Sequence, residues 1–302
     1  MNWYKVTLTL GSPSGTPWQA DTIFGHLCWR LRHNKGDKTL SNFLEWFLAG
    51  EPALLLSDGF PDELLPKPLL FALPRLEGIA AFDQVKEIKK QVFLSHRDFT
   101  RAIHGDLFTP EKHDEKVDGT LRIDVRNQIN RETGTTGSEG QLYSFASHWI
   151  RTVSIYMKIE KGFETLVEEL FTALKDTGYG KRKSVGYGAI EQVRMEPFPG
   201  FPPPSNPNAF VSLSSFVPAE GDPVNGRWGL RVKMGKLGEE LAASEDPFKR
   251  PLIMLTPGSA FYDSPVKEYY GRLVGEVSPA HPEVVQYGFA LPVPMLVTGE
   301  AK

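Results

Sequence analysis

Hydrophobic and polar residues alternate or recur at fixed spacing in several segments of the first two thirds of the chain. Over residues 4–10 apolar side chains occupy every second position, which predicts a strand with one buried face. Between Ile23 and Leu31, and again between Phe163 and Leu174, they recur every three or four positions, which predicts amphipathic helices. Further alternating segments predict strands at 121–129, 142–150, 153–159 and 187–195.

The segments at 121–129 and 142–150 flank a run rich in glycine, threonine and serine at 134–140. Two alternating strands on either side of such a run predict a long β-hairpin with a polar tip. The order strand, helix, hairpin, helix, strand is that of a ferredoxin-like α+β fold with insertions. In that fold helices cover one face of the sheet and leave the other open.

Six prolines within residues 197–207 indicate a stiff linker. We therefore expect an N-terminal domain at 1–196 and a C-terminal domain at 208–302. The second region shows few helical patterns, and its predicted strands lie near 209–217, 227–234, 251–256, 270–277 and 285–291.

The chain of 302 residues carries a formal net charge of -3 and has a pI near 6.2. It lacks the basic balance of a free nucleic-acid binder, so any RNA contact must come from local patches. Its single cysteine, Cys28, excludes an intrachain disulfide and a cysteine-rich zinc site. The first ten residues are strand-like rather than signal-like, and no run of 18 apolar residues indicates a membrane span. A cytoplasmic location is expected.

Residues 178–188 hold four glycines, the cations Lys181, Arg182 and Lys183, and Ser184. Glycine allows positive φ and close backbone approach, and successive N–H groups in such a loop can bind an anion. The segment differs from a Walker A loop and from a dinucleotide fingerprint in the order of its elements. It predicts contact with the phosphates of RNA, and an exposed loop without a ligand is the alternative.

Candidate RNA contacts also occur on the predicted hairpin and in the loop after the first strand. Arg122 and Arg126 share the polar face of their strand, where arginine can bind two phosphate oxygens, although Asp124 is an alternative partner. Tyr143 is a candidate for base stacking, although an aromatic strand face is more often part of a core. In the early loop Ser12, Ser14 and Thr16 could donate to phosphates, and Trp18 could stack on a base or pack against a neighbouring subunit.

The ordered motifs resemble the RAMP superfamily of CRISPR proteins, and within it the subunit-four family of the type III-A Csm effector complex. The glycine-rich loop resembles the signature of that superfamily. Residues 16–29 resemble its first loop and helix, 126–133 with 140–143 its hairpin "thumb", and 257–261 with 287–294 segments of its second domain.

The resemblance implies two tandem ferredoxin-like (RRM-like) domains, the first with an inserted thumb. It further implies a non-catalytic subunit, without cofactor or metal, that caps the 5′ tag of the CRISPR RNA in antiviral defence. One copy would bridge RAMP backbone subunits to the large polymerase-like subunit. The residues assigned to RNA are Ser12, Ser14, Thr16, Trp18, Gln19, Arg126, Asn127, Arg131, Thr133, Tyr143, Gly178, Gly180, Lys181, Arg182, Lys183, Ser184, Gly186 and Gly188.

A repeat-processing endoribonuclease of the same superfold is the alternative function. That enzyme needs a general acid and a general base around the scissile phosphate. His26, in the first helix near the presumed RNA loop, is the main candidate, but no paired His–Lys or His–Tyr arrangement is evident.

Overall fold

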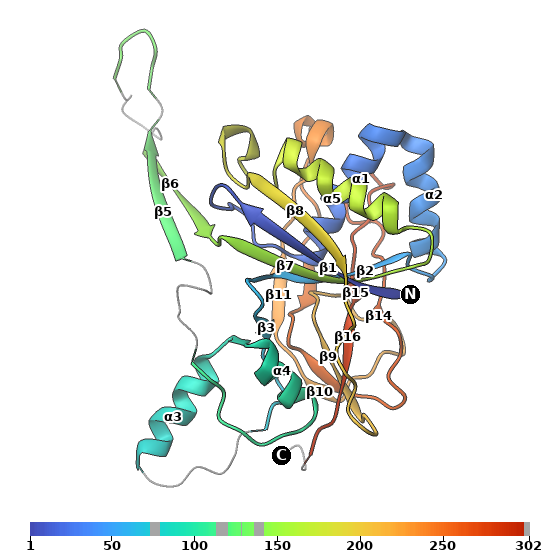
Figure 1. The fold of residues 1–302 in the computed structure, drawn as a ribbon. Helices are drawn as coiled ribbons and strands as arrows, with labels where there is room; N and C mark the ends of the chain where they lie inside the picture. The colour runs from blue at the N-terminus through green and yellow to red at the C-terminus, as the bar shows by residue number, and fades with distance from the viewer. Residues whose placement is uncertain (73–78, 113–119, 128, 136–141, 299–302) are drawn as a thin grey trace.

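The computed structural model describes residues 1–72, 79–112, 120–127, 129–135 and 142–298 (Figure 1). Gln128 and most of the glycine-rich hairpin tip, at 136–140, lie outside the described residues. The first sheet has the order β2-β7-β1-β8, and every neighbouring pair is antiparallel. Its elements are β1 (Asn2–Leu10), α1 (Ala20–Lys35), α2 (Asp37–Leu48), β2 (Leu54–Pro61), β7 (Thr152–Ile159), α5 (Glu164–Thr177) and β8 (Ile190–Pro197).

This order and pairing are those of the split βαβ arrangement, with an insertion between β2 and β7. Periodicity predicted neither β2 nor the short elements of the insertion, and it counted the hairpin strands in the main order, whereas the family resemblance implied an inserted thumb. The hairpin forms a separate two-stranded sheet. The insertion comprises β3 (Leu65–Pro66), α3 (Ile79–Lys90), β4 (Phe93–Leu94), α4 (His96–Ile103), β5 (Thr120–Asn127) and β6 (Leu142–Trp149).

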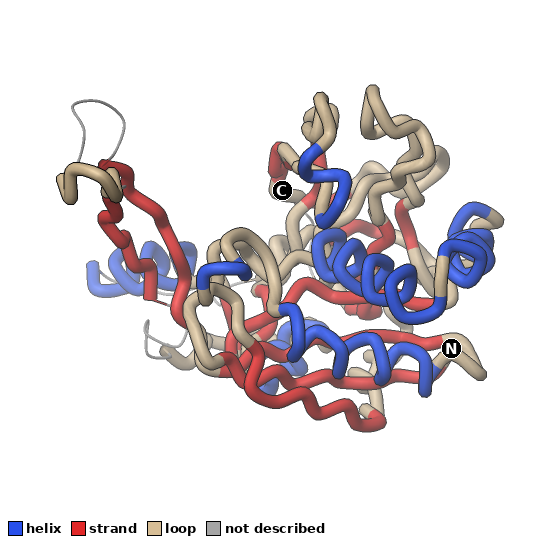
Figure 2. Tube along the Cα trace, turned by 90° about the horizontal axis from the view of Figure 1, so that it is seen from above, coloured by secondary structure: helices blue, strands red, loops and turns tan. Residues whose placement is uncertain are grey.

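The predicted periodicities correspond to real buried faces. Val6, Leu8 and Leu10 of β1 are fully buried, as are the helix positions Val167 and Phe171 of α5. Helix α5 ends at Gly178, whose φ of 67° suits a residue without a side chain. Helices α1 and α5 cover one face of the sheet (Figures 1 and 2).

The opposite face of the sheet is also covered, contrary to expectation. Phe198 and Phe201, from the proline-rich stretch, pack edge-on against Trp3 of β1 and against Tyr156 of β7. Phe99 of α4 extends the cluster. The proline-rich segment is thus packed onto the sheet, because Phe201 is buried and Phe198 partly buried, while its prolines keep it extended.

The second half is a set of short strands whose four-stranded sheet has the order β10-β13-β9-β16. Residues 178–298, all described, contain no α-helix, so the two helices of a second ferredoxin-like unit are absent there. Its elements are β9 (Ala209–Ser212), β10 (Gly226–Arg227), β11 (Leu230–Lys233), β12 (Leu252–Leu255), β13 (Ala260–Tyr262), β14 (Tyr270–Gly271), β15 (Phe289–Ala290), β16 (Pro292–Met295) and the 3-10 helix η2 (Glu239–Ala243).

One hydrophobic cluster contains residues of both halves, including Leu27 of α1, Phe47 of α2, and Tyr287 and Phe289. Phe47 and Phe289 lie 6.1 Å apart between ring centroids. The halves therefore share a core, and the division at 197–207 stays a prediction.

Candidate nucleic-acid interface

The glycine-rich loop runs from Gly178 to Gly188 and folds back against the loop that follows β1. All four of its glycines have positive φ, between 66° and 91°. A Cβ on Gly188 would lie 2.0 Å from the carbonyl oxygen of Tyr179, and one on Gly180 would lie 2.7 Å from Cβ of Thr16. Glycine is therefore required here by backbone conformation and, at two positions, by close packing.

Hydrogen bonds fix the two loops to each other. The N–H of Lys181 donates to Oγ1 of Thr16 at 2.9 Å, and the N–H of Ala189 donates to Oγ of Ser12 at the same distance. The N–H of Gly188 donates to the carbonyl of Pro13 at 2.8 Å. Ser12 and Thr16 thus position the glycine-rich loop, which is a role that the sequence analysis did not assign to them.

The hairpin β5–β6 projects from the body (Figure 1). Side chains on one of its faces contact the glycine-rich loop. Arg182 donates to the hydroxyl of Tyr143 at 3.1 Å and lies over the rings of Tyr143 and Phe145. Tyr187 lies edge-on to Phe145 and accepts from Nη2 of Arg126 at 3.0 Å. Loop and hairpin therefore form one continuous surface.

Tyr187 also donates to Asp124 at 2.8 Å, while Arg122 donates to the other oxygen of that carboxylate at 2.7 Å. The hydrogen bond from Tyr187, with that of Arg122 and the nearby positive charge, holds the pKa of Asp124 below its usual range. Asp124 is thus a partner of Arg122, as the alternative interpretation had it. Tyr187 was not predicted to take part, although an aromatic residue between two glycines was the available signal.

The family model described as the RAMP superfamily matches residues 19–191, which is more than half of the chain. The chain belongs to the RAMP superfamily. The matched range extends from the start of α1 through the hairpin to the end of the glycine-rich loop. It therefore contains most of the surface just described.

Individual relatives agree with this RAMP assignment and confirm the resemblance to subunit four. A Streptococcus thermophilus protein, "CRISPR system Cms protein Csm4", is 24% identical over 275 residues, which cover 84% of this chain and 83% of the relative. A chain of a "Csm1-Csm4 cassette in complex with pppApA" is 18% identical and superposes with a TM-score of 0.65 over 99% of this chain and 100% of its own. A chain of a "Csm3-Csm4 subcomplex" is 16% identical, with a TM-score of 0.60 over 97% and 99%.

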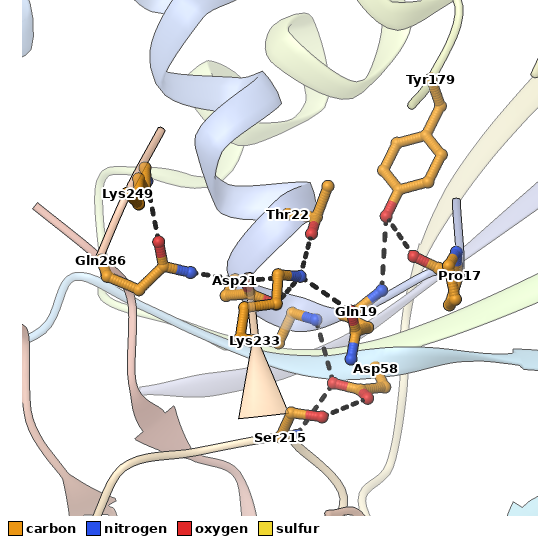
Figure 3. A network of polar contacts seen from close by, with 11 residues as sticks. Pro17, Gln19, Asp21, Thr22, Asp58, Tyr179, Ser215, Lys233, Lys249 and Gln286 are labelled. Carbon is orange, nitrogen blue, oxygen red and sulfur yellow. Dashed lines mark hydrogen bonds and ion pairs between the residues drawn. The ribbon is translucent and has the colours of Figure 1, made fainter. Parts of the chain in front are cut away.

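Three side chains assigned to RNA, those of Ser14, Trp18 and Gln19, are buried in this RAMP chain, and the assignment is wrong for them. Trp18 is 4% exposed, stacks on Tyr179 at 3.7 Å between ring centroids, and donates to Oγ of the buried Ser14 at 3.1 Å. Oε1 of Gln19 accepts from Nζ of Lys233 at 2.7 Å (Figure 3). Trp18 and Ser14 pair with each other within the first half, and Gln19 pairs with the second half, so no side-chain surface is left for a base.

That packing includes a buried polar network at the start of α1 (Figure 3). Lys233, from β11, forms an ion pair with Asp21 at 2.8 Å, and Asp58 of β2 accepts from both the N–H and the hydroxyl of Ser215. Asp58 also accepts from the N–H of Ala20 at 2.9 Å. Each bond joins the first half to the second or to the helix start, so the network stabilises the end of the loop that precedes α1.

Gly178 and Gly188 are also buried, whereas the assigned cations, Ser184 and the assigned hairpin residues lie on the accessible part of the surface. Lys181 and Ser184 are exposed in the loop, and Arg182 and Lys183 are partly exposed. Arg126, Asn127 and Tyr143 are exposed on the hairpin strands. Arg131 and Thr133 lie in the turn beyond them and are exposed, farther along the projecting hairpin (Figure 1).

His26, the candidate catalytic residue of an endoribonuclease, instead supports the backbone of the glycine-rich loop. Its Nε2 accepts the N–H of Gly180 at 3.1 Å. Burial, together with the charge of Lys183 and against the opposing effect of Glu239, lowers the pKa of His26 to about 4. A neutral imidazole whose acceptor nitrogen is occupied by the loop backbone is poorly suited to general acid–base catalysis.

The thiol of Cys28 is likewise unsuited to catalysis. Burial raises the pKa of Cys28 to about 12, so this thiol is a packing group. Within the described ranges no three His, Cys, Asp or Glu side chains are arranged to hold a metal ion. None of the helices in that part of the chain is long and apolar enough to cross a membrane.

Proposed function

We propose that this RAMP chain is a non-catalytic subunit of a type III-A CRISPR effector ribonucleoprotein, where it holds and caps the 5′ tag of the CRISPR RNA. The observation that carries the proposal is the joint surface of the glycine-rich loop and the hairpin. Arg182 is held by Tyr143 and Arg126 by Tyr187, while Lys181 and Ser184 remain exposed beside them. Prepositioned cations next to an exposed aromatic ring suit single-stranded RNA.

The same proposal includes the partners. The solved relatives are named as assemblies of Csm4 with Csm1 and with Csm3. By this likeness one copy of the chain would join a large polymerase-like subunit to a RAMP backbone subunit in the cytoplasm. The net charge of -3 supports a need for such partners, because charge alone would not hold RNA strongly. Trp228, 47% exposed, is a candidate contact, whereas Phe261 is buried beneath it.

Replacing Lys181, Arg182 and Lys183 together by alanine tests the RNA surface. We expect binding of a labelled tag RNA to weaken by about tenfold or more at low salt. The salt dependence should also flatten, because each cation that no longer neutralises a phosphate of a single strand lowers the slope by about 0.7. Fluorescence anisotropy across a salt series measures both quantities.

The matched control replaces Lys86, Lys89 and Lys90, three exposed cations of α3, by alanine. The loss of charge is the same, but α3 lies far from the glycine-rich loop (Figure 1). Equal weakening by the two triple variants would mean that only net charge matters, and the proposed surface would be abandoned.

The hairpin provides a second test, because it extends away from the core and its apolar face is exposed. Leu121, Ile123 and Val125 are each more than half exposed. We expect trypsin to cut the free chain after Arg126 and Arg131, and bound tag RNA or the assembled complex to slow that cleavage at least severalfold. Mass spectrometry of timed digests identifies the sites. If the free chain resisted cleavage equally well, the hairpin would be an ordinary part of the fold.

A further inference from the structure

A single carboxylate of the second half neutralises two cations beneath the glycine-rich loop. Oε1 of Glu239, at the start of η2, accepts from Nζ of Lys183 and from Nη2 of Arg30, the latter at 3.1 Å. The side chains of Glu239 and Lys183 are 21% and 25% exposed, so solvent and ligands can reach them. Arg30, on α1, is only 10% exposed.

The carboxylate leaves Arg30 incompletely satisfied. Nε of Arg30 is buried and has no hydrogen-bond partner among the described residues, while Nη2 is shared between Glu239 and Nδ1 of His33. An arginine fork binds two oxygens of one anion when the geometry allows it. A buried donor without a partner is unfavourable, and here it lies beside the ion pair.

Glu239 is also held in a conformation that its residue type disfavours. Its φ is +49°, in the left-handed region that residues with a side chain rarely adopt. Burial raises the pKa of Glu239, but the hydrogen bond and charge of Lys183 and the charge of Arg30 outweigh this and hold the pKa below its usual range. The carboxyl group of Glu239 is therefore ionised. Its contacts with Lys183 and Arg30, rather than the backbone preference of glutamate, hold it in this conformation.

We propose that Arg30 and Lys183 form a binding site for a phosphate group of RNA, and that Glu239 occupies this site in the RNA-free chain. The proposal rests on the function proposed above and extends it. Lys183 follows the exposed Lys181 by two residues, so RNA held by the loop brings a phosphate within reach of the ion pair. Binding then exchanges one anion for another and releases η2 from the loop. RNA binding is thereby coupled to the second half of the chain.

The Glu239→Gln variant tests the exchange, because it removes the competing charge and keeps the shape. The full chain is titrated with a 3′-labelled tag RNA between 50 and 200 mM salt. We expect about threefold to fivefold tighter binding, the range of a partly exposed ion pair, and a salt slope steeper by about 0.7. Glu240→Gln is the control, since this neighbouring exposed residue contacts His33 and Arg32 instead. It should change affinity by less than about twofold.

The same RNA titration in a Lys183→Ala background tests whether the gain depends on the contact between Glu239 and Lys183. If Glu239 competes with phosphate for Lys183, the gain from Glu239→Gln should largely disappear there. A gain of equal size in both backgrounds, an equal gain from Glu240→Gln, or no gain would each overturn the inference. RNA carrying a 5′ phosphate instead of a 5′ hydroxyl distinguishes a terminal phosphate, for which the gain would be larger, from a backbone phosphate.

Lys181→Ala separates this inference from the proposed function. Lys181 contributes an exposed side chain to the loop, whereas Lys183, two residues later, pairs with Glu239. If Lys181→Ala weakens binding while Glu239→Gln changes nothing, RNA binding stands and the exchange is refuted. If the wild-type chain binds no RNA, alone or in its assembly, both proposals fail.

Discussion

The Gly188→Ala variant should lose about 2–5 kcal/mol of its free energy of unfolding, enough to disorder the glycine-rich loop. Two costs add at this position. A φ of +66° costs a residue with a Cβ about 1–2 kcal/mol. The new Cβ would also lie 2.0 Å from the backbone oxygen of Tyr179, and overpacking against rigid atoms costs about 1–3 kcal/mol. Denaturant unfolding of the purified variants measures the loss.

Gly186→Ala is the matched control within the same loop. Its φ of +91° gives a similar conformational cost, but no atom lies within 4 Å of the position where its Cβ would be. We expect a loss of about 1–2 kcal/mol and a loop that still binds RNA. Equal losses in the two variants would show that the contact between Gly188 and Tyr179 is not rigid.

Periodicity predicted those elements that bury one face against one partner layer. The alternation at 4–10 and the helical spacing in 163–174 correspond to β1 and α5 within a few residues. Strand β2, Leu54–Pro61, was missed because nearly every residue in it is buried, so no alternation marks it. Strand β16 contains Pro292 and Pro294 and was also missed. It lies at the edge of its sheet, where missing N–H donors are tolerated.

Local chemistry located the candidate site, but it did not determine which of its side chains are free. The glycine-rich loop, Arg126 and Tyr143 were predicted and meet in space. Trp18 was misassigned because only the tertiary fold shows that Tyr179 covers it. Glu239 is 56 residues from Lys183 and 209 from Arg30, so no sequence spacing could have indicated their contact.

The second large effect concerns pH and centres on His26. The folded chain favours neutral imidazole, because burial and the charges of Lys183 and Arg30 lower the pKa of His26 from 6.5 to about 4, against the opposing charge of Glu239. In the unfolded chain His26 takes up a proton below about pH 6.5, and in the folded chain only below about pH 4. Its contribution to stability is therefore complete above pH 6.5 and falls as the pH drops through this window. The expected loss is about 3 kcal/mol, at about 1.4 kcal/mol per pKa unit.

The variant His26→Gln isolates this effect, because a glutamine oxygen can accept from the N–H of Gly180 but does not titrate between pH 4 and 7. Other groups, such as the buried Asp58 with its raised pKa, titrate in both proteins, and their effects largely cancel in the comparison. We expect the wild type to lose about 2–3 kcal/mol more than the variant between pH 7 and pH 4.5 in urea unfolding. Parallel stability profiles would mean that His26 is protonated as readily in the folded chain as in the unfolded one. The conclusion that a neutral His26 accepts the hydrogen bond from Gly180 would then have to be rejected.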